Sequence, residues 1–141
     1  MVEESPESFI NRWRRHAAEV ELFAHTEGSP MLECRAGDVI LQLFERTGPY
    51  QSRPGPARVI INPVVESVTV VEAHLAEPHH VESTGVSRLK ATGRIAERDG
   101  RVLVVEAGMP LVISSLTELS AEFAVGATVS LISLAPVHAF V

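Results

Sequence analysis

The sequence predicts an α+β fold that is mainly antiparallel β, with an N-terminal amphipathic helix followed by a small β-barrel. Apolar residues recur at helical spacing near the start of the chain, whereas much of the remainder alternates between apolar and polar residues. Turn sequences such as Ala36-Gly37-Asp38 and Arg98-Asp99-Gly100 separate the alternating runs. The length of 141 residues and the hydrophobic share of 45% fit a single domain with a packed core.

The predicted helix covers residues 6–22. Ser5 supplies a capping hydroxyl, Pro6 takes the first helical position, and Glu7 places an acid in the first turn. Apolar residues at helical spacing then give the helix one apolar face: Phe9, Trp13, Ala17 and Val20.

Residues 31–77 are predicted to form a β segment. It begins with a hairpin over 31–46 that turns at Gly37. Residues 47–57 hold three prolines and form a long loop, which we expect to be either functional or a plain surface connection. Val and Ile dominate residues 59–77, and Pro63, which lacks an N–H, indicates a strand start, an edge or a bulge.

Residues 87–141 are predicted to form a second β segment, and its first strand is the clearest in the chain. Between residues 87 and 97 the side chains alternate, so Arg88, Lys90, Thr92 and Arg94 share one face of the strand. The opposite face carries Leu89, Ala91, Gly93 and Ile95. After the Asp99-Gly100 turn, a return strand is expected over 101–106.

The rest of this segment alternates between strand and helix signals. A short strand is expected over 111–114. A capping box at Ser115-Leu116-Thr117-Glu118 then predicts a helix near 115–125 that ends at Gly126. Residues 127–134 form a further strand, and residues 137–141 are a candidate for a short last one.

This order of strand, strand, strand, helix, strand and candidate strand resembles the OB-fold, a five-stranded Greek-key barrel with a helix between its third and fourth strands. The segments ATGRIAERDGRVLVVEAGMPLVI and VGATVSLISL carry the resemblance. It implies that the C-terminal half is OB-like and that Gly93 lies in a long curved first strand, where a barrel has to bend. It also implies a ligand among oligonucleotides, oligosaccharides and proteins, without choosing between them.

The phrase LKATGRIAERDGRVLVVEA is also similar to a strand pair of hot-dog thioesterases. That fold wraps its sheet around a long central helix, which would have to lie in the first half of this chain. Residues 47–66 are rich in proline and β-branched residues instead. The hot-dog fold is therefore the second-ranked fold, and a hot-dog-like enzyme ranks below a binding role as a function.

Eighteen acidic and twelve basic residues give a net charge of −6. This balance disfavours a general nucleic-acid binder, because such proteins gain much of their affinity by neutralising phosphates. A single cysteine, Cys34, excludes an internal disulfide framework and a cysteine-rich zinc module. The opening residues MVEESPESF lack the basic and apolar regions of a secretory signal, so a cytoplasmic protein is expected.

The stretch from Phe123 to Val141 carries no charged residue. A membrane anchor is one interpretation, but Ser, Thr, Pro and His dilute the stretch, and polar groups are costly in hydrocarbon. We favour a segment buried both in its own domain and against a second subunit, because interfaces of permanent oligomers resemble a core cut in half. The sequence thus predicts no membrane contact and a homo-oligomer that assembles through this C-terminal segment.

Three histidines, His74, His79 and His80, fall within seven positions and alternate with glutamates: Glu72, Glu77 and Glu82. Imidazole and carboxylate groups bind zinc, nickel and iron. The three histidines are therefore a candidate metal site of a metal-dependent enzyme, although their spacing matches neither an HxH pair nor an HExxH motif. The competing interpretation is an exposed polar loop.

Other catalytic patterns do not occur in the sequence. It holds no GxSxG, Walker or GxGxxG motif, so neither a nucleophilic serine nor a phosphate-binding loop is indicated. No cofactor is expected. Cys34 falls in a predicted strand and is interpreted as a small buried hydrophobic residue.

The best candidate nucleic-acid surface consists of Arg88, Lys90 and Arg94, with Arg98 at the end of the same strand. Single-strand binders stack bases on aromatic side chains, yet no aromatic residue occurs between Tyr50 and Phe123. A solvated basic face is the competing interpretation. The leading hypothesis is accordingly a non-catalytic binding or assembly module that acts as a homo-oligomer, with a further protein as a candidate partner. The alternative is an OB-type protein that binds single-stranded nucleic acid.

Overall fold

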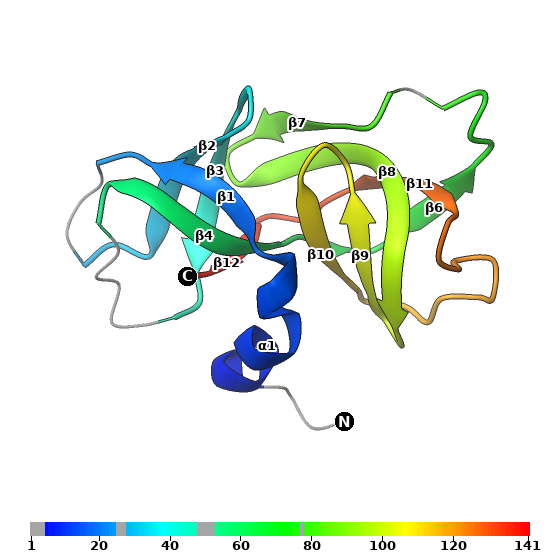
Figure 1. Cartoon of the computed structure of the whole chain (residues 1–141), viewed down its shortest axis with the longest axis horizontal. Helices are drawn as coiled ribbons and strands as arrows, with labels where there is room; N and C mark the ends of the chain where they lie inside the picture. The colour runs from blue at the N-terminus through cyan, green and yellow to red at the C-terminus, as the bar shows by residue number, and fades with distance from the viewer. Residues whose placement is uncertain (1–4, 25–27, 48–52, 77) are drawn as a thin grey trace.

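The computed structural model describes residues 5–24, 28–47, 53–76 and 78–141. Two curved sheets stand side by side, and a short helix lies across their junction (Figure 1). The helical part comprises α1 (Pro6–Trp13) and one turn of 3-10 helix, η1 (Arg14–His16). The strands are β1 (Ala18–Leu22), β2 (Met31–Ala36), β3 (Val39–Glu45), β4 (Gly55–Asn62), β5 (Val64–Val65), β6 (Val68–Val71), β7 (His80–Gly85), β8 (Arg88–Asp99), β9 (Val102–Glu106), β10 (Pro110–Ser115), β11 (Thr128–Ile132) and β12 (His138–Phe140).

The first sheet is a closed barrel with the strand order β1, β2, β3, β12, β4. Its neighbouring strands run antiparallel, apart from the parallel pair β3 and β12. Alternate residues of β1 and β2 are buried, so Val20, Leu22, Leu32 and Cys34 belong to the hydrophobic core. The predicted class, α+β and mainly antiparallel with a helix ahead of a barrel, is confirmed.

The second sheet has the strand order β5, β10, β9, β8, β11, β6, and β7 pairs with the first half of β8. Its two end strands, β5 and β6, are consecutive pieces of one stretch, separated by Glu66 and Ser67. The sheet therefore curls until both of its ends lie on a single segment of chain.

The two sheets repeat one topology and exchange a strand. In the barrel, β12 runs parallel to the third strand, β3, and antiparallel to the fourth, β4. In the second sheet, β5 is parallel to the third strand, β10, and β6 is antiparallel to the fourth, β11. The last strand of each half of the chain thus pairs within the sheet of the other half: β5 and β6 join the second sheet, and β12 joins the barrel.

This exchange concerns two points of the sequence prediction. The OB-like resemblance places the candidate strand at 137–141 in the C-terminal barrel, but His138–Phe140 pair with β3 and β4 of the first barrel. The sequence alone does not show whether residues 31–77 join the strands of 87–141 in one sheet, and in the structure residues 64–65 and 68–71 do so. A lent strand satisfies the backbone N–H and C=O groups of its acceptor sheet as well as a strand of the same half would.

The predicted helix over 6–22 is wrong beyond His16. Helix α1 ends at Trp13, η1 ends at His16, and Ala17 is already extended. Residues 18–22 then form β1, with Ala18, Val20 and Leu22 buried at a spacing of two. Pairing with β2 and β4 outweighs the helical pattern, because Ala18, Val20 and Leu22 also give the segment an apolar face with a period of two.

The helix predicted near 115–125 is also absent from the structure, which shows turns and irregular chain there. The guanidinium group of Arg98 donates hydrogen bonds to the carbonyl oxygens of Leu119 (2.5 Å), Ser120 (2.7 Å) and Phe123 (3.0 Å). Those backbone acceptors are therefore satisfied by a long-range side chain rather than by a helical ladder. The Ser115 hydroxyl does accept a bond from the Thr117 N–H, but no helix follows.

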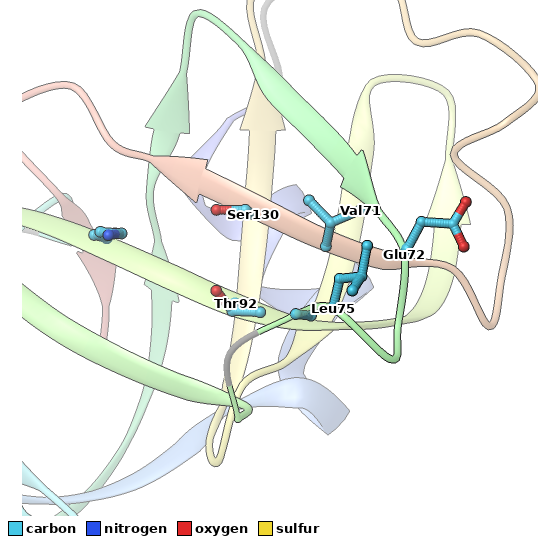
Figure 2. A pocket seen from close by; sticks show the side chains of 7 residues that line it. Val71, Glu72, Leu75, Thr92 and Ser130 are labelled. Carbon is cyan, nitrogen blue, oxygen red and sulfur yellow. The ribbon is translucent and has the colours of Figure 1, made fainter.

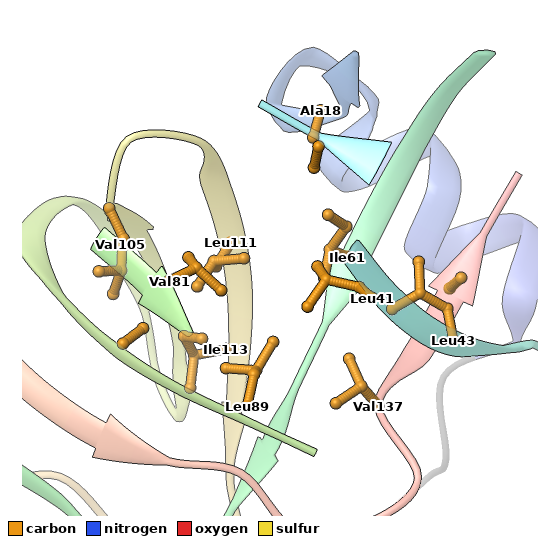
Figure 3. Close-up of a cluster of buried hydrophobic side chains, with 14 of the residues drawn as sticks. Ala18, Leu41, Leu43, Ile61, Val81, Leu89, Val105, Leu111, Ile113 and Val137 are labelled. Carbon is orange, nitrogen blue, oxygen red and sulfur yellow. The ribbon is translucent and has the colours of Figure 1, made fainter. Parts of the chain in front are cut away.

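The interior is formed by one large hydrophobic cluster that runs from the second sheet into the barrel (Figure 3). Leu89, Leu111 and Ile113 approach it from the second sheet, and Leu41 and Ile61 from the barrel. A single core therefore joins the two sheets.

A separate cluster lies under α1, where Phe9 and Trp13 pack with Ile60, Val104, Val112 and Phe140. These partners come from both sheets, so the helix covers their junction from outside (Figure 1). It is not wrapped by a sheet, as the central helix of a hot-dog fold would be. No helix in the described part of the chain is long and apolar enough to cross a membrane.

Candidate functional site

The outer face of the second sheet carries the polar residues that sequence analysis singled out. Its strands run in the order β7, β8, β11, β6, and their outward side chains form rows across the sheet. One row joins Glu82, Lys90 and Ile132, and the next joins His80, Thr92, Ser130 and Thr69. This surface is called the outer sheet face below.

Three cations lie on the outer sheet face as the alternation predicts. Arg88, Lys90 and Arg94 occupy alternate positions of β8, between the buried Leu89, Ala91 and Ile95. Within the described residues, none of the three side chains makes a hydrogen bond or ion pair with another side chain. Glu82 stands opposite Lys90 and Glu106 opposite Arg94 in the strand pairs, but neither carboxylate forms an ion pair with its neighbour.

Arg98 does not extend this row. The register of β8 against β9 shifts between Ile95 and Glu97, which re-aims the end of the strand. The Arg98 guanidinium bonds four backbone carbonyl oxygens, of Gly100 and of the 119–123 segment. It is a structural group, and its assignment to the basic surface is not supported by its contacts.

A pocket of about 410 Å³ opens on the outer sheet face (Figure 2). It is lined by residues of β6, β8 and β11 and of the turn after β6: Val71, Glu72, Leu75, Ala76, Lys90, Thr92 and Ser130. The volume falls in the range of small-molecule sites, and the wall combines apolar residues with a few polar groups, as such sites usually do.

The polar and apolar parts of the pocket are separated. In Figure 2 the hydroxyl oxygens of Thr92 and Ser130 point to the same side, whereas Val71 and Leu75 stand at the other. The Glu72 carboxylate points away from both hydroxyls, and its side chain is 74% exposed. Thr92 is only 3% exposed, yet its hydroxyl donates no hydrogen bond to another described side chain.

The three candidate metal ligands do not converge. His74 lies in the exposed turn after β6, with Nδ1 3.8 Å from a Glu72 carboxylate oxygen. His80 lies in β7, where Nδ1 is 2.5 Å from the Pro78 carbonyl oxygen and Nε2 is 4.0 Å from a Glu82 oxygen. Over the described residues, which include His79 but not Glu77, no group of three His, Cys, Asp or Glu side chains could hold a metal ion.

Cys34 is confirmed as a buried residue of the barrel interior, with 0% exposure. Burial is the main reason why the pKa of its thiol is raised to about 11, and the nearby Glu33 adds to the effect. The thiol is therefore protonated at neutral pH, whereas nucleophilic chemistry requires the thiolate. The candidate loop 47–57 lies partly outside the described residues, which exclude 48–52.

Sequence reasoning missed the wall formed by Val71, Leu75, Ala76 and Ser130. Leu75 falls within the predicted β segment 31–77, but it lies in a turn and is 76% exposed. A lone exposed leucine has no sequence signature, and the position of Ser130 depends on which strand pairs with β8.

Comparisons were made with protein-family models, with curated proteins and with solved structures, and none of them gives a match for this chain.

Proposed function

We propose that the protein is a non-catalytic binding module that holds an anionic ligand on its outer sheet face. The observation that carries this proposal is the row of Arg88, Lys90 and Arg94, three cations without a described side-chain partner, beside a pocket of about 410 Å³. Charged groups left unpaired on one face attract opposite charge and steer its approach. The net charge of −6 makes this local positive row distinct from the rest of the chain.

An OB-like fold is part of the proposal. The repeated five-strand unit, with its fifth strand parallel to the third, supports a Greek-key barrel of that kind. OB-folds usually bind ligands across their second and third strands. Here the outer residues Val104 of β9 and Val112 of β10 lie under α1, so the ligand would use the neighbouring face of β8 and β11 instead.

Single-stranded nucleic acid is the second candidate ligand for the same surface. The three cations are spaced along β8 as phosphate contacts could be, which favours this candidate. The rows of the outer sheet face contain no Phe, Tyr or Trp side chain among the described residues, which favours a ligand without bases to stack.

The test uses the full chain labelled with ¹⁵N and two probes, inorganic phosphate and a dodecamer of deoxythymidine. Binding should shift amide signals of β8 and β11, and the triple variant Arg88→Glu, Lys90→Glu, Arg94→Glu should abolish these shifts. The control variant Arg35→Glu, Arg58→Glu changes cations on the barrel and should leave them intact. Unchanged binding by the triple variant would overturn the proposal.

The dodecamer separates the two candidates. If it is the true class of ligand, its affinity should exceed that of phosphate by orders of magnitude. Its affinity should also fall with salt at a slope of about −2, as expected for three neutralised phosphates. A dodecamer no tighter than phosphate would leave the small anion as the ligand.

We also propose that the chain assembles as a homo-oligomer through its C-terminal segment. Much of that segment is core of its own chain, since Val129, Leu131, Val137 and Ala139 are buried. Exposed apolar residues outside the outer sheet face rows support a contact with a second copy: Val125 (65%), Val141 (43%) and Leu134 (38%). Light scattering coupled to size-exclusion chromatography should find a dimer or larger species at low and high salt, and a monomer at micromolar concentration would exclude this assembly.

A further inference from the structure

The pocket on the outer sheet face has one end built for a negative charge. Lys90, Thr92 and Ser130 line it, and Thr92 faces Ser130 directly across the β8–β11 pair. Residues facing each other in an antiparallel pair have Cα atoms roughly 4.5–5.5 Å apart, so both hydroxyls can reach one small group of atoms. An ammonium with two hydroxyl donors suits a carboxylate or phosphate oxygen.

The other end of the pocket is apolar. Val71 is the last residue of β6, and Leu75 of the turn that follows lies near it (Figure 2). Ala76 also lines the pocket. Leu75 is 76% exposed, so a ligand placed against it would remove apolar surface from water. Glu72 lies at this rim, and its carboxylate points outward, so the carboxylate does not enter the apolar end of the pocket.

We infer that this pocket binds a small amphipathic anion, with one carboxylate or phosphate head at Lys90, Thr92 and Ser130 and a compact apolar body against Val71, Leu75 and Ala76. The inference rests on the proposed function and narrows it to a class of ligand. The volume of about 410 Å³ holds a body of the size of one aromatic ring or a short alkyl chain. Polymeric anions and free inorganic ions use the charged end alone and leave the apolar end empty.

A series of probes on the unmodified full chain tests this division. Acetate and inorganic phosphate carry the head, benzoate and phenyl phosphate carry head and body, and benzyl alcohol carries the body without charge. Titrations followed by ¹⁵N chemical shifts should place benzoate and phenyl phosphate at Val71, Leu75, Thr92 and Ser130. Each should bind at least about tenfold more tightly than acetate, phosphate or benzyl alcohol, because a hydrophobic contact and a charged hydrogen bond each contribute about this factor or more.

An exposed position, Leu75, and a half-buried one, Lys90, supply variants that leave the core untouched. Leu75→Ser should weaken benzoate about tenfold and leave acetate unchanged, and its control is Leu116→Ser, a leucine 55% exposed outside the pocket lining. Lys90→Gln should make benzoate and benzyl alcohol bind equally, and its control is Arg58→Gln, an arginine of β4 in the barrel that does not line the pocket.

The outcomes separate this inference from the proposed function. If anions bind at β8 but benzoate is no tighter than acetate, the inference is overturned and the general anion surface stands. If benzyl alcohol equals benzoate, the pocket is merely apolar, which also overturns the inference. If no anion shifts any signal of the outer sheet face, both proposals fail.

Discussion

Replacement of Gly93 by alanine should destabilise the protein, although Gly93 does not have a left-handed backbone. The site lies in β8 opposite Val129 on one side, and β9 crosses close by on the other. A Cβ atom added there would overlap the Glu106 carbonyl oxygen and would stand 2.7 Å from Val105 Cγ1 and 2.8 Å from the Glu106 carbonyl carbon. Ordinary van der Waals contacts of Cβ atoms begin at 3.4 Å, so the neighbours would have to move.

Two opposing effects determine the magnitude. Alanine in place of a glycine of compatible backbone stabilises a protein by about 0.4–1 kcal/mol, because it restricts the unfolded chain. Overpacking of a filled core costs about 1–3 kcal/mol, and the upper part of this range applies because the atoms in the way belong to backbone. The net expectation is a loss of about 1–2 kcal/mol in the free energy of unfolding.

Urea denaturation followed by Trp13 fluorescence measures this loss. With a slope of about 2 kcal/mol per molar urea, the midpoint should fall by about 0.5–1 M. The matched control is the same substitution in a Val105→Ala background, where one clashing methyl group is gone and the penalty should shrink. An alanine variant as stable as the parent, or more so, would show that β8 and β9 do not approach as closely as described.

Three further predictions concern other parts of the molecule. Trp13→Ala should lower the free energy of unfolding by about 3–5 kcal/mol. Trp13→Phe should lower it far less, because the buried Nε1 atom has no hydrogen-bond acceptor. A large loss of unfolding free energy for Trp13→Phe in urea titrations would reveal an acceptor. Cys34, whose thiol pKa is raised to about 11, should resist iodoacetamide at pH 8 in the folded protein and react after unfolding in urea. Mass spectrometry measures the labelling, and rapid labelling of the folded form would contradict the burial of the thiol. The pKa of Glu97 is lowered, chiefly by the hydrogen bond from Arg15 (2.5 Å) and further by His16. The stabilising effect of Glu97 is therefore complete above the pKa of its unfolded form and is lost as the pH falls through the pKa of its folded form. Glu97→Gln should flatten the acid limb of the curve of unfolding free energy against pH, and an unchanged limb would count against the ion pair.

The ion pairs of α1 also bear on how the molecule is held together. Arg12 pairs with Asp99, and Arg15 and His16 pair with Glu97, so the start of the chain is joined to the end of β8. These groups are exposed or half-buried and screened by solvent, so the burial of Phe9 and Trp13 contributes more to docking of the helix than the charges do.

Patterns that lie within one strand were predictable from the sequence. The alternation over residues 87–97 placed Arg88, Lys90 and Arg94 on one outward face. This placement follows from the geometry of a single chain segment, in which successive side chains point to opposite faces. The burial of Cys34 and the cap at Ser5 are equally local, and both are confirmed.

The competition between helix and strand was decided only by tertiary pairing. Ala18, Val20 and Leu22 satisfy a barrel interior, and β2 and β4 offer hydrogen bonds on both sides of the segment. Near 115–125, Arg98 takes the carbonyl oxygens that a helix would use. The residues that pair with these two segments are distant in sequence, so the sequence did not show that their interactions would outweigh the helical patterns over 6–22 and 115–125.

The sequence by itself determined the fold class, the helical start and the faces of the clearest strands. The exchange of β12 for β5 and β6 could be seen only in the tertiary structure, and so could the pocket, because β6 forms part of its wall. Backbone N–H and C=O groups are the same in every strand, so hydrogen bonding does not tell one candidate strand from another. The choice depends on how the buried side chains of β4 and β12 fill one shared core, which links residues more than seventy positions apart.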